Sequence, residues 1–535
     1  MEKRTITAII LSVAVLLIYQ AVITKTHKQN IQPVTAVVSQ VGQDMQPSVY
    51  QGVETSEQMG VPSIEAQEYT IEKDTTQLAF SSQGAVITNI LFKEAAEEYS
   101  LIEQKDAGFA PLELWFGNIA DNSNYTVLSM DGEINFSAEI EEKLEIEKRI
   151  TFSNSKYGAE LEIVFRNLSG IDRKMAYSIV AASNINRSAG MDKRFSGIQS
   201  RINGATVWEN LRKLKLNNGW DEVNGFAEWT GLRNAYYEVI LKPEKPASGV
   251  ILRRIDKDVF ACGLKIDTFV IPAGQQVSHK YLLYAGPGSM EDLAVYGLED
   301  AIYFGKLDFI CKFLLKSLNF FYHVTHNYGM AIIVLTLSIG LILFPLSLKN
   351  FRAMRQMQVI QPQITKLKEM HQNNPHKLQQ EMMLLYKKNK VNPIGGCLPM
   401  LLQMPIFFSL YLTLVRSVEL KGASFLWIKD LSSTDAVYSF SGNLPVIGEH
   451  INLLPILMII AMFFQQKISS YKKATSDPQL EQQQKMMLIM PLVFGIIFYN
   501  LPSGLVLYWL TNTIFMTLVQ FYIAKTMPSV ETIAG

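Results

Sequence analysis

Five polar side chains stand inside long apolar stretches of the second half of the chain, where they could do chemistry. They are Thr336, Ser338, Gln403, Tyr508 and Trp509. Polar residues in membrane spans usually mark a pathway or a site. No paired carboxylate and no series of histidine and aspartate residues accompanies them. The pattern indicates a wet, weakly selective concavity rather than an ion relay, with hydrogen bonding that only joins helices as the alternative.

The backbone around Gln403 is unusual for a membrane helix. The stretch VNPIGGCLPMLLQMPIFFSLY, residues 391–411, carries three prolines and a glycine pair. A proline inside a helix removes a backbone hydrogen bond and costs about 3 kcal/mol in a soluble helix. Irregular backbone at membrane depth is tolerated where it faces protein or a water-filled cavity. The stretch therefore predicts a site that does not face lipid.

The motifs of common enzyme classes are absent from the sequence. It has no G-x-S-x-G, no phosphate-binding loop, no dinucleotide fingerprint and no H-E-x-x-H. Cys262, Cys311 and Cys397 are too scattered for a disulfide framework or a metal site and are expected to be small buried residues. The formal net charge of zero argues against general nucleic-acid binding. We expect no enzyme activity, catalytic residue, metal, cofactor or nucleic-acid partner.

The N-terminal part predicts a membrane anchor and a tether. MEKR precedes an apolar run that ends at Ile23, and about 20 residues span the hydrocarbon core. Lys3 and Arg4 keep the N-terminus in the cytoplasm, and bulky residues leave no cleavage site. Residues 1–23 are therefore predicted to be an uncleaved signal anchor. Residues 24–69 are polar and nearly free of aromatic residues, which predicts a flexible periplasmic linker.

Residues 70–299 predict an all-β sandwich. TQLAFSSQGAVITNILF, FSAEIEEKLEIEKRITF, AELEIVFRNL and YYEVILKP alternate apolar and polar residues, with Gly, Asn, Asp and Pro clusters between them. Because the segment follows a span whose N-terminus is inside, it is expected in the periplasm. A sugar-binding or sugar-modifying sandwich is one alternative, and it would need a carboxylate or histidine pair that the strand spacing does not single out.

Residues 300–322 predict an amphipathic helix in the outer membrane interface. An ordinary helix packed on the sandwich is the alternative. The apolar stripe consists of Tyr303, Leu307, Ile310, Leu314 and Leu318. The polar face consists of Lys306, Asp308, Lys312, Lys316 and Asn319, with Phe309 and Phe313 as exceptions.

Five further spans are predicted, which gives a polytopic α-helical membrane protein with six spans. The five lie within residues 328–524, at 328–348, 396–415, 451–467, 486–500 and 503–524. The first loop between them is strongly basic and the second is not, so the positive-inside rule places the first in the cytoplasm. Both termini are then cytoplasmic. The connections are a cytoplasmic hairpin at 348–394, a periplasmic loop at 416–450, a cytoplasmic loop at 468–485 and a short tail at 525–535.

The basic loop is predicted to form two helices, with Pro362 and Pro375 as punctuation and a joint near HQNNPHK. Its methionines suit adaptable contacts, whereas a solvated charge run between spans is the alternative. The residues proposed for contacts at the hairpin and the mouth of the concavity are Lys349, Arg352, Arg355, Met382, Met383 and Tyr386.

Several long motifs resemble one known family. NPIGGCLPMLLQMPIFFSLY, SVELKGASFLWIKDLS, LPILMIIAMFFQQK and LPSGLVLYWLTN resemble the YidC membrane protein insertases of Gram-negative bacteria, and GFAEWTGLRNAYYEVIL resembles their periplasmic domain. The resemblance implies a non-enzymatic insertase and chaperone of inner-membrane proteins, with five spans around a hydrophilic groove that is open to the cytoplasm and to lipid. It implies as partners nascent membrane proteins, the Sec translocon, the signal recognition particle receptor and, because the tail is short and weakly basic, the ribosome only weakly. It also implies that the periplasmic domain is largely dispensable.

By motif matching, Thr336, Gln403, Tyr508, Trp509 and Ser338 fall at groove positions. The basic groove residue of the family corresponds to Gly340, so we expect an insertase that relies on polarity more than on charge, in which Gly340→Arg changes little.

Three residues could replace the missing charge. Lys349 and Arg352 could hold a positive potential at the groove mouth. Arg416 could enter the groove from its outer end, or could be a snorkelling interface residue.

A transporter with broken helices is the main competing class. It would need internal repeats and intramembrane acids, and the spans show neither.

Overall fold

The computed structural model describes residues 66–526, except 74–75, 95–96, 104–108, 131, 142, 153–155, 187–194, 210–213, 215–218, 257–258, 372–373, 390–397, 445–447 and 470–488. The predicted anchor at 1–23 and nearly all of the predicted linker lie outside the described residues, as do most of the loop at 468–485 and of the tail. The described residues all belong to one unit, Ile64–Gly535.

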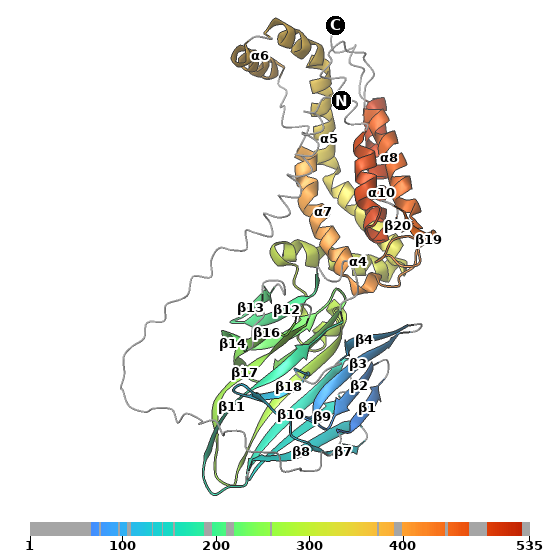
Figure 1. Cartoon of the computed structure of the whole chain (residues 1–535). Helices are drawn as coiled ribbons and strands as arrows, with labels where there is room; N and C mark the ends of the chain where they lie inside the picture. The colour runs from blue at the N-terminus through green and yellow to red at the C-terminus, as the bar shows by residue number, and fades with distance from the viewer. Residues whose placement is uncertain are drawn as a thin grey trace. The chain divides into compact units, whose positions relative to one another are not determined.

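Two antiparallel sheets form the first half of the described chain, here called the β-domain (Figure 1). The smaller sheet contains, in order, β1 (Glu68–Lys73), β2 (Thr76–Ser81), β3 (Val86–Glu94) and β4 (Glu97–Glu103). The larger sheet runs in the order β6 (Ile119–Ala120), β5 (Leu114–Phe116), β11 (Arg173–Ser183), β17 (Phe260–Ile271), β16 (Ala247–Arg254), β14 (Asp221–Arg233), β15 (Tyr237–Pro243), β18 (Gln276–Pro287), β10 (Gly158–Asn167), β9 (Leu144–Phe152), β8 (Glu133–Glu141) and β7 (Thr126–Met130). A branch of β12 (Gly197–Ile202) and β13 (Ala205–Glu209) joins it through β14.

Alternation of side chains fixes which face of each strand is buried. In β9 the residues Leu144, Ile146, Lys148 and Ile150 point inward and are buried. Both sheets contribute to one shared apolar core, to which β2 brings Phe80, β3 brings Ile90 and the larger sheet brings most of the rest. The predicted all-β domain is therefore confirmed, although its pattern contains one inward lysine that alternation alone does not explain.

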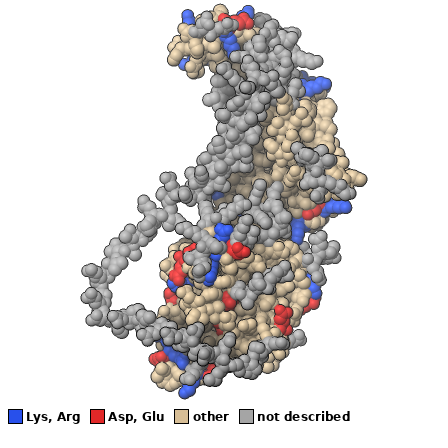
Figure 2. Space-filling view, in the orientation of Figure 1, with Lys and Arg blue, Asp and Glu red and all other residues tan. Residues whose placement is uncertain are grey.

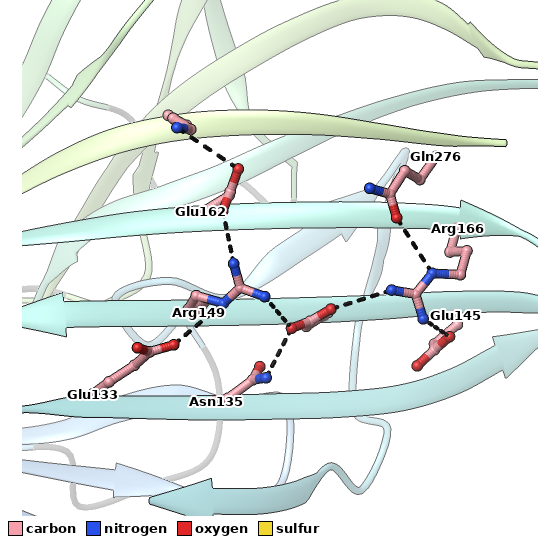
Figure 3. Close-up of polar contacts among 9 residues, drawn as sticks. Glu133, Asn135, Glu145, Arg149, Glu162, Arg166 and Gln276 are labelled. Carbon is pink, nitrogen blue, oxygen red and sulfur yellow. Dashed lines mark hydrogen bonds and ion pairs between the residues drawn. The ribbon is translucent and has the colours of Figure 1, made fainter. Parts of the chain in front are cut away.

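The outward face of the same strands carries a lattice of ion pairs (Figure 3). Arg149 contacts three carboxylates, of Glu133, Glu147 and Glu162, at 3.2, 2.8 and 3.2 Å. Arg166 contacts Glu145 at 2.7 Å and Glu147 at 3.6 Å. Each glutamate of the lattice therefore has an arginine partner on a neighbouring strand, which is the arrangement of a solvated strand face rather than of an acid–base pair.

A connecting segment leads from the β-domain to an amphipathic helix. It contains α3 (Met290–Ala294), which Ser289 caps by accepting a hydrogen bond from the Asp292 amide, and two 3₁₀ turns, η3 (Glu299–Ala301) and η4 (Gly305–Leu307). The helix α4 (Asp308–Thr325) therefore starts later than the sequence predicts, because η4 occupies the expected first turn. Leu314 and Leu318, which belong to the predicted apolar stripe, are buried inside the protein.

The exposed face of α4 is partly apolar. Its side chains Phe309 and Phe313 are 85% and 63% exposed, and Phe320 and Val324 follow on the same face. A helix that keeps aromatic side chains exposed beside lysines suits a membrane interface, as the sequence predicts. The prediction of that location remains untested by the geometry.

The remaining helices lie beside one another in Figure 1 and are here called the helical core. They are α5 (Tyr328–Met370), α7 (Leu398–Arg416), α8 (Leu453–Ser469), a helix at Ile489–Phe498 and α10 (Ser503–Thr526). The helix α6 (Pro375–Lys388) follows α5, and a short 3₁₀ turn, η6 (Val418–Leu420), and the strands β19 (Tyr438–Leu444) and β20 (Gly448–Ile451) connect α7 to α8.

The 43-residue helix α5 joins a predicted span to the first helix of the predicted hairpin. Pro345 and Pro362 lie inside it, so Pro362 does not punctuate the hairpin as the sequence suggested. The second break is where it was predicted: the helix ends at Met370, and Pro375 begins α6 behind the capping side chain of Asn374.

Among the described residues, two helices are long and apolar enough to cross a membrane, Tyr328–Phe351 and Ser503–Ile523. Leu453–Ile468 and Ile489–Phe498 are shorter apolar helices. On the face shown in Figure 2, uncharged surface lies over α8 and α10, whereas lysines and arginines gather at α6. The exposed residues of α8 and α10 include Ile456, Ile460, Phe464, Ile514, Leu518 and Phe521.

Candidate functional site

Two of the predicted groove residues meet across the helical core. The Gln403 amide in the first half of α7 donates a hydrogen bond from Nε2 to the hydroxyl of Tyr508 on α10, at 2.6 Å. Tyr508 is 1% exposed and Gln403 is half-buried. Since these residues are 105 positions apart and lie in otherwise apolar helices, the contact forms a polar spot where α7 and α10 pack.

The hydroxyl groups of α5 are satisfied within their own helix. Thr336 donates to the carbonyl of Ile332 at 2.6 Å, and Ser338 donates to that of Val334 at 2.8 Å. Thr336 is only 2% exposed, whereas Ser338 is half-buried. Such bonds to the preceding turn let a hydroxyl sit in an apolar helix without an unpaired group. Of the two, Ser338 keeps the more accessible side chain.

Trp509 lies in an aromatic cluster rather than among polar groups. Its ring stacks on Phe494 at 5.5 Å between centroids and contacts Phe498 at 5.0 Å. It meets Phe407 of α7 edge-on at 5.1 Å. Because these contacts join three helices, Trp509 stabilises the packing beside the Gln403–Tyr508 pair.

Gly340 is a contact point between helices. A Cβ atom at this position would lie 2.6 Å from Cε1 and 2.8 Å from Cδ1 of Phe515 on α10. These distances are shorter than real Cβ contacts, so any larger residue displaces the phenyl ring. Position 340 is therefore a close contact with α10, whereas its place in the groove and the small effect expected of Gly340→Arg stay predictions.

The hairpin residues divide into a packed group and an exposed group. Met382 and Tyr386 of α6 pack on Ile360 and Ile364 of α5. Met383 is 54% exposed, and Lys349 is exposed on α5. Arg352 and Arg355 also lie on α5, and their side chains are outside the described set.

Arg416 is buried against the β-domain, so the sequence interpretation of it as a snorkelling interface residue is wrong, whereas its relation to the groove stays a prediction. It ends α7 and is 9% exposed. Its Nη1 donates to the carbonyl of Tyr303 at 2.9 Å, before α4 begins. The guanidinium lies 5.4 Å from the Trp208 ring and 5.0 Å from the Phe304 ring. The long side chain turns toward the β-domain because rings and a carbonyl are available there.

Two further features near this junction, one within the β-domain and one between it and the segment after α7, escaped the sequence reasoning. Arg233 and Glu238 form a buried ion pair at 3.0 Å near Arg416. Lys421, after α7, donates to the Tyr237 hydroxyl at 3.1 Å and lies 4.8 Å from that ring. The available signal was the presence of two charged residues, Arg233 and Glu238, in the mainly apolar run WTGLRNAYYEVIL, in which every position except Tyr236 is buried.

A cavity of about 240 Å³ is lined by residues of α3 and its N-terminal flank, of α4 and of η6. Its polar lining includes Ser289, Glu291, Asp292, Asn319, His323 and Glu419. No group of three or more His, Cys, Asp or Glu side chains in the described part of the chain could hold a metal ion. The free thiols Cys262 and Cys311 are buried, as predicted, and Cys397 lies outside the described residues.

Comparison with known proteins decides the family. A curated protein of Syntrophus aciditrophicus (strain SB), "Membrane protein insertase YidC", is 33% identical over 98% of this chain and 100% of its own length. The chain belongs to the YidC family of membrane protein insertases. A YidC insertase of Geotalea uraniireducens (strain Rf4) is 32% identical over 99% of this chain and 100% of that protein.

Two family models together match most of the chain, and the boundary between them falls inside α4. The model described as "YidC periplasmic domain" matches residues 68–317, and that described as "60Kd inner membrane protein" matches residues 320–530. A solved structure, "Active YidC insertase crystal structure with the first transmembrane domain resolved", is 19% identical, covers 86% of this chain and 93% of that chain, and has a TM-score of 0.38. The family is thus one of inner-membrane proteins with a periplasmic domain.

Proposed function

We propose that this chain inserts and folds inner-membrane proteins through a hydrophilic groove bounded by α5, α7 and α10 and open to the cytoplasm and to lipid. The observation that carries the proposal is similarity over the whole chain to curated membrane protein insertases. The Gln403–Tyr508 pair supports the groove's place, because it puts an amide and a hydroxyl between apolar helices. Ser338 adds a half-buried hydroxyl on α5.

The physical task is to move a polar segment across about 30 Å of hydrocarbon, where each unpaired backbone group costs several kcal/mol. A groove that admits water to part of this depth shortens the apolar path without making a pore. Burial of the substrate's own apolar span in lipid supplies the free energy, at about 25 cal/mol per Å² of apolar surface. The mechanism needs no nucleotide.

The proposed topology has six spans with both termini in the cytoplasm and the β-domain in the periplasm. The basic residues of α5 and α6 support a cytoplasmic hairpin, and the exposed methionine of α6 suits contacts with varied partners. We propose nascent membrane proteins as substrates and the Sec translocon and the signal recognition particle receptor as partners, with weak ribosome contact.

The test is rescue of a bacterium depleted of its own insertase, with insertion of a small phage coat protein followed by protease protection. Wild-type chain should restore insertion, whereas Gln403→Leu and Tyr508→Phe should lower it by a factor of about 2 to 5, because each removes one partner of the buried polar contact. Thr511→Val is the matched control, since that hydroxyl bonds to the Leu507 carbonyl of its own helix at 2.8 Å.

Failure of the well-expressed wild-type chain to restore insertion would contradict the proposal. The broken-helix transporter would then be the remaining candidate, and solute uptake into vesicles would be its test.

A further inference from the structure

Three charged side chains are buried together where the β-domain meets the helical core. Arg233 is 3% exposed, Glu238 is 1% exposed and Arg416 is 9% exposed. Arg233 Nη1 lies 3.0 Å from Glu238 Oε1. Burial raises the pKa of Glu238, and the two arginines oppose that rise. The ion pair itself lies within the β-domain, and Arg416 of α7 lies near enough to Glu238 to interact with it electrostatically.

The register of the strands places the β-domain's part of this cluster on one face. Arg233 on β14 is paired with Gly197 on β12 and with Glu238 on β15. Directly paired residues of antiparallel strands point to the same face. A Cβ at Gly197 would lie 2.4 Å from the Trp208 ring, so the glycine makes room for that indole. The face therefore offers a carboxylate and an aromatic surface to an incoming cation.

Arg416 fills that face from the end of α7. Its guanidinium lies over the rings of Trp208, Phe304 and Phe195 at 5.4, 5.0 and 6.0 Å. Nε and Nη2 have no hydrogen-bond partner among the described residues, so the rings take the place of acceptors. The Nη1 bond to the Tyr303 carbonyl adds the segment before α4. One side chain thus touches the β-domain, the connecting segment and the helical core.

The apolar packing around the cluster is continuous across the same three parts. One buried cluster contains Trp229, Ile240 and Tyr284 of the β-domain, Ile302 and Phe304 of the connecting segment, Cys311 and Leu315 of α4, and half-buried Leu412 of α7. Within it, Thr413 donates to the Cys311 carbonyl at 3.4 Å and Cys311 donates to the Ser409 carbonyl at 3.4 Å. The C-terminal end of α7 is therefore held in place by contacts with both α4 and the β-domain.

We propose that Arg416 is a positioning residue that uses the β-domain to hold α7, and with it Gln403, against Tyr508 of α10. Gln403 lies on the same helix, about 20 Å from Arg416 at 1.5 Å per residue. The expected effect of Arg416 on insertion rests on the proposed function. The position of Gln403 relative to Tyr508 can be measured whether or not that function is correct. It assigns the β-domain a measurable part in insertion, where the family resemblance implies that this domain is largely dispensable.

The experiment measures position and activity separately in the full-length chain. The reporter is a disulfide between Gln403→Cys and Tyr508→Cys, quantified by mass spectrometry after mild oxidation in nanodiscs. Insertion is measured in the depleted bacterium with chains that keep Gln403 and Tyr508. The variants added to each are Arg416→Gln, Arg416→Lys and, from the β-domain side, Trp208→Leu. Lys429→Gln, an exposed lysine in the loop after α7, is the matched control.

We expect Arg416→Gln and Trp208→Leu each to lower the disulfide yield and the insertion rate at least about threefold, as expected for loss of a coupling between contacting groups. Arg416→Lys should recover part of both, since it keeps the charge but not the planar group. Lys429→Gln should change neither. Proteolytic resistance of the β-domain should stay at the wild-type level in all variants.

Unchanged disulfide yield in a folded Arg416→Gln or Trp208→Leu chain would overturn the positioning role. Lower yield with unchanged insertion would uphold the positioning of Gln403 and count against the groove as the proposed function places it. If Arg416→Gln does not fold, Trp208→Leu decides alone, because it alters the contact without touching α7.

Discussion

At the scale of single residues, Lys148 is a cation without access to solvent. It is 0% exposed, and its Nζ donates to the carbonyls of Gly84, Leu112 and Ala85 at 2.6, 2.9 and 3.3 Å. Burial lowers its pKa to about 8, although the carboxylates of Asp121 and Glu113 oppose this. A lysine in an inward strand position is therefore explained by two loops whose backbone groups it satisfies.

Replacement of Lys148 by methionine should destabilise the protein at pH 7 by about 1–3 kcal/mol, because buried carbonyls lose their donor. The folded pKa of Lys148 is about 8 and the ordinary value is 10.5, so the wild-type free energy of unfolding should rise relative to Lys148→Met as pH increases through this window. Urea denaturation of both full-length chains in detergent at several pH values checks this. A difference that shrinks with pH would contradict it.

For the substitution Gly340→Arg, the structure predicts the opposite effect on activity from the one that the sequence suggested. Gly340→Arg must displace the Phe515 ring, which a Cβ would approach to 2.6 Å, and it also adds a charge to an apolar helix contact. We expect it to lower the melting temperature and to reduce insertion several-fold. The double variant Gly340→Arg/Phe515→Ala should regain part of the loss. An active, fully stable single variant would show instead that the two helices separate readily at this point.

At the scale of elements, the hairpin of α5 and α6 contains two adjacent methionines, of which one is packed and the other is exposed. Met382 packs on Ile360 and Ile364, whereas the adjacent Met383 is 54% exposed. Met382→Ser should therefore speed hydrogen exchange throughout α6, because it removes apolar contacts that stabilise a helix with no buried residue of its own. Met383→Ser should leave exchange unchanged and lower cross-linking to a nascent substrate. Equal exchange in both variants would argue against this division.

Local patterns predicted most elements, and longer-range packing decided their ends. Alternation in LEIEKRITF predicts β9 correctly, since period two reports which face is buried. The continuation of α5 through Pro362 was missed, because a proline predicts a break only when the helix has no other support. The 3₁₀ turn that delays α4 to Asp308 was also missed.

At the scale of the whole molecule, contacts between distant segments limited what the sequence could reveal. Gln403 and Tyr508 were expected in one site, because both are polar residues inside apolar spans and fall at groove positions by motif matching, and the structure does join them. The role of Arg416 depends on Tyr303, Trp208 and Glu238, which are more than 100 positions away. Local sequence patterns cannot relate residues that are this far apart. The sequence therefore contained no sign that Arg416 holds the end of α7 against the β-domain.

The proposed topology predicts which single cysteines a membrane-impermeant maleimide reaches in cells whose outer membrane has been permeabilised. Phe226→Cys in the β-domain and Val437→Cys after α7 should be labelled, since both positions are exposed and predicted to be periplasmic. Met383→Cys should be labelled only after the inner membrane is opened, because the basic hairpin stays in the cytoplasm. The unsubstituted chain, in which Cys262 and Cys311 are 0% exposed, measures the background. Labelling at position 383 while the inner membrane is intact would place the hairpin between α5 and α7 in the periplasm. The groove would then open to the periplasm, where no nascent chain arrives, and the proposed topology would be contradicted.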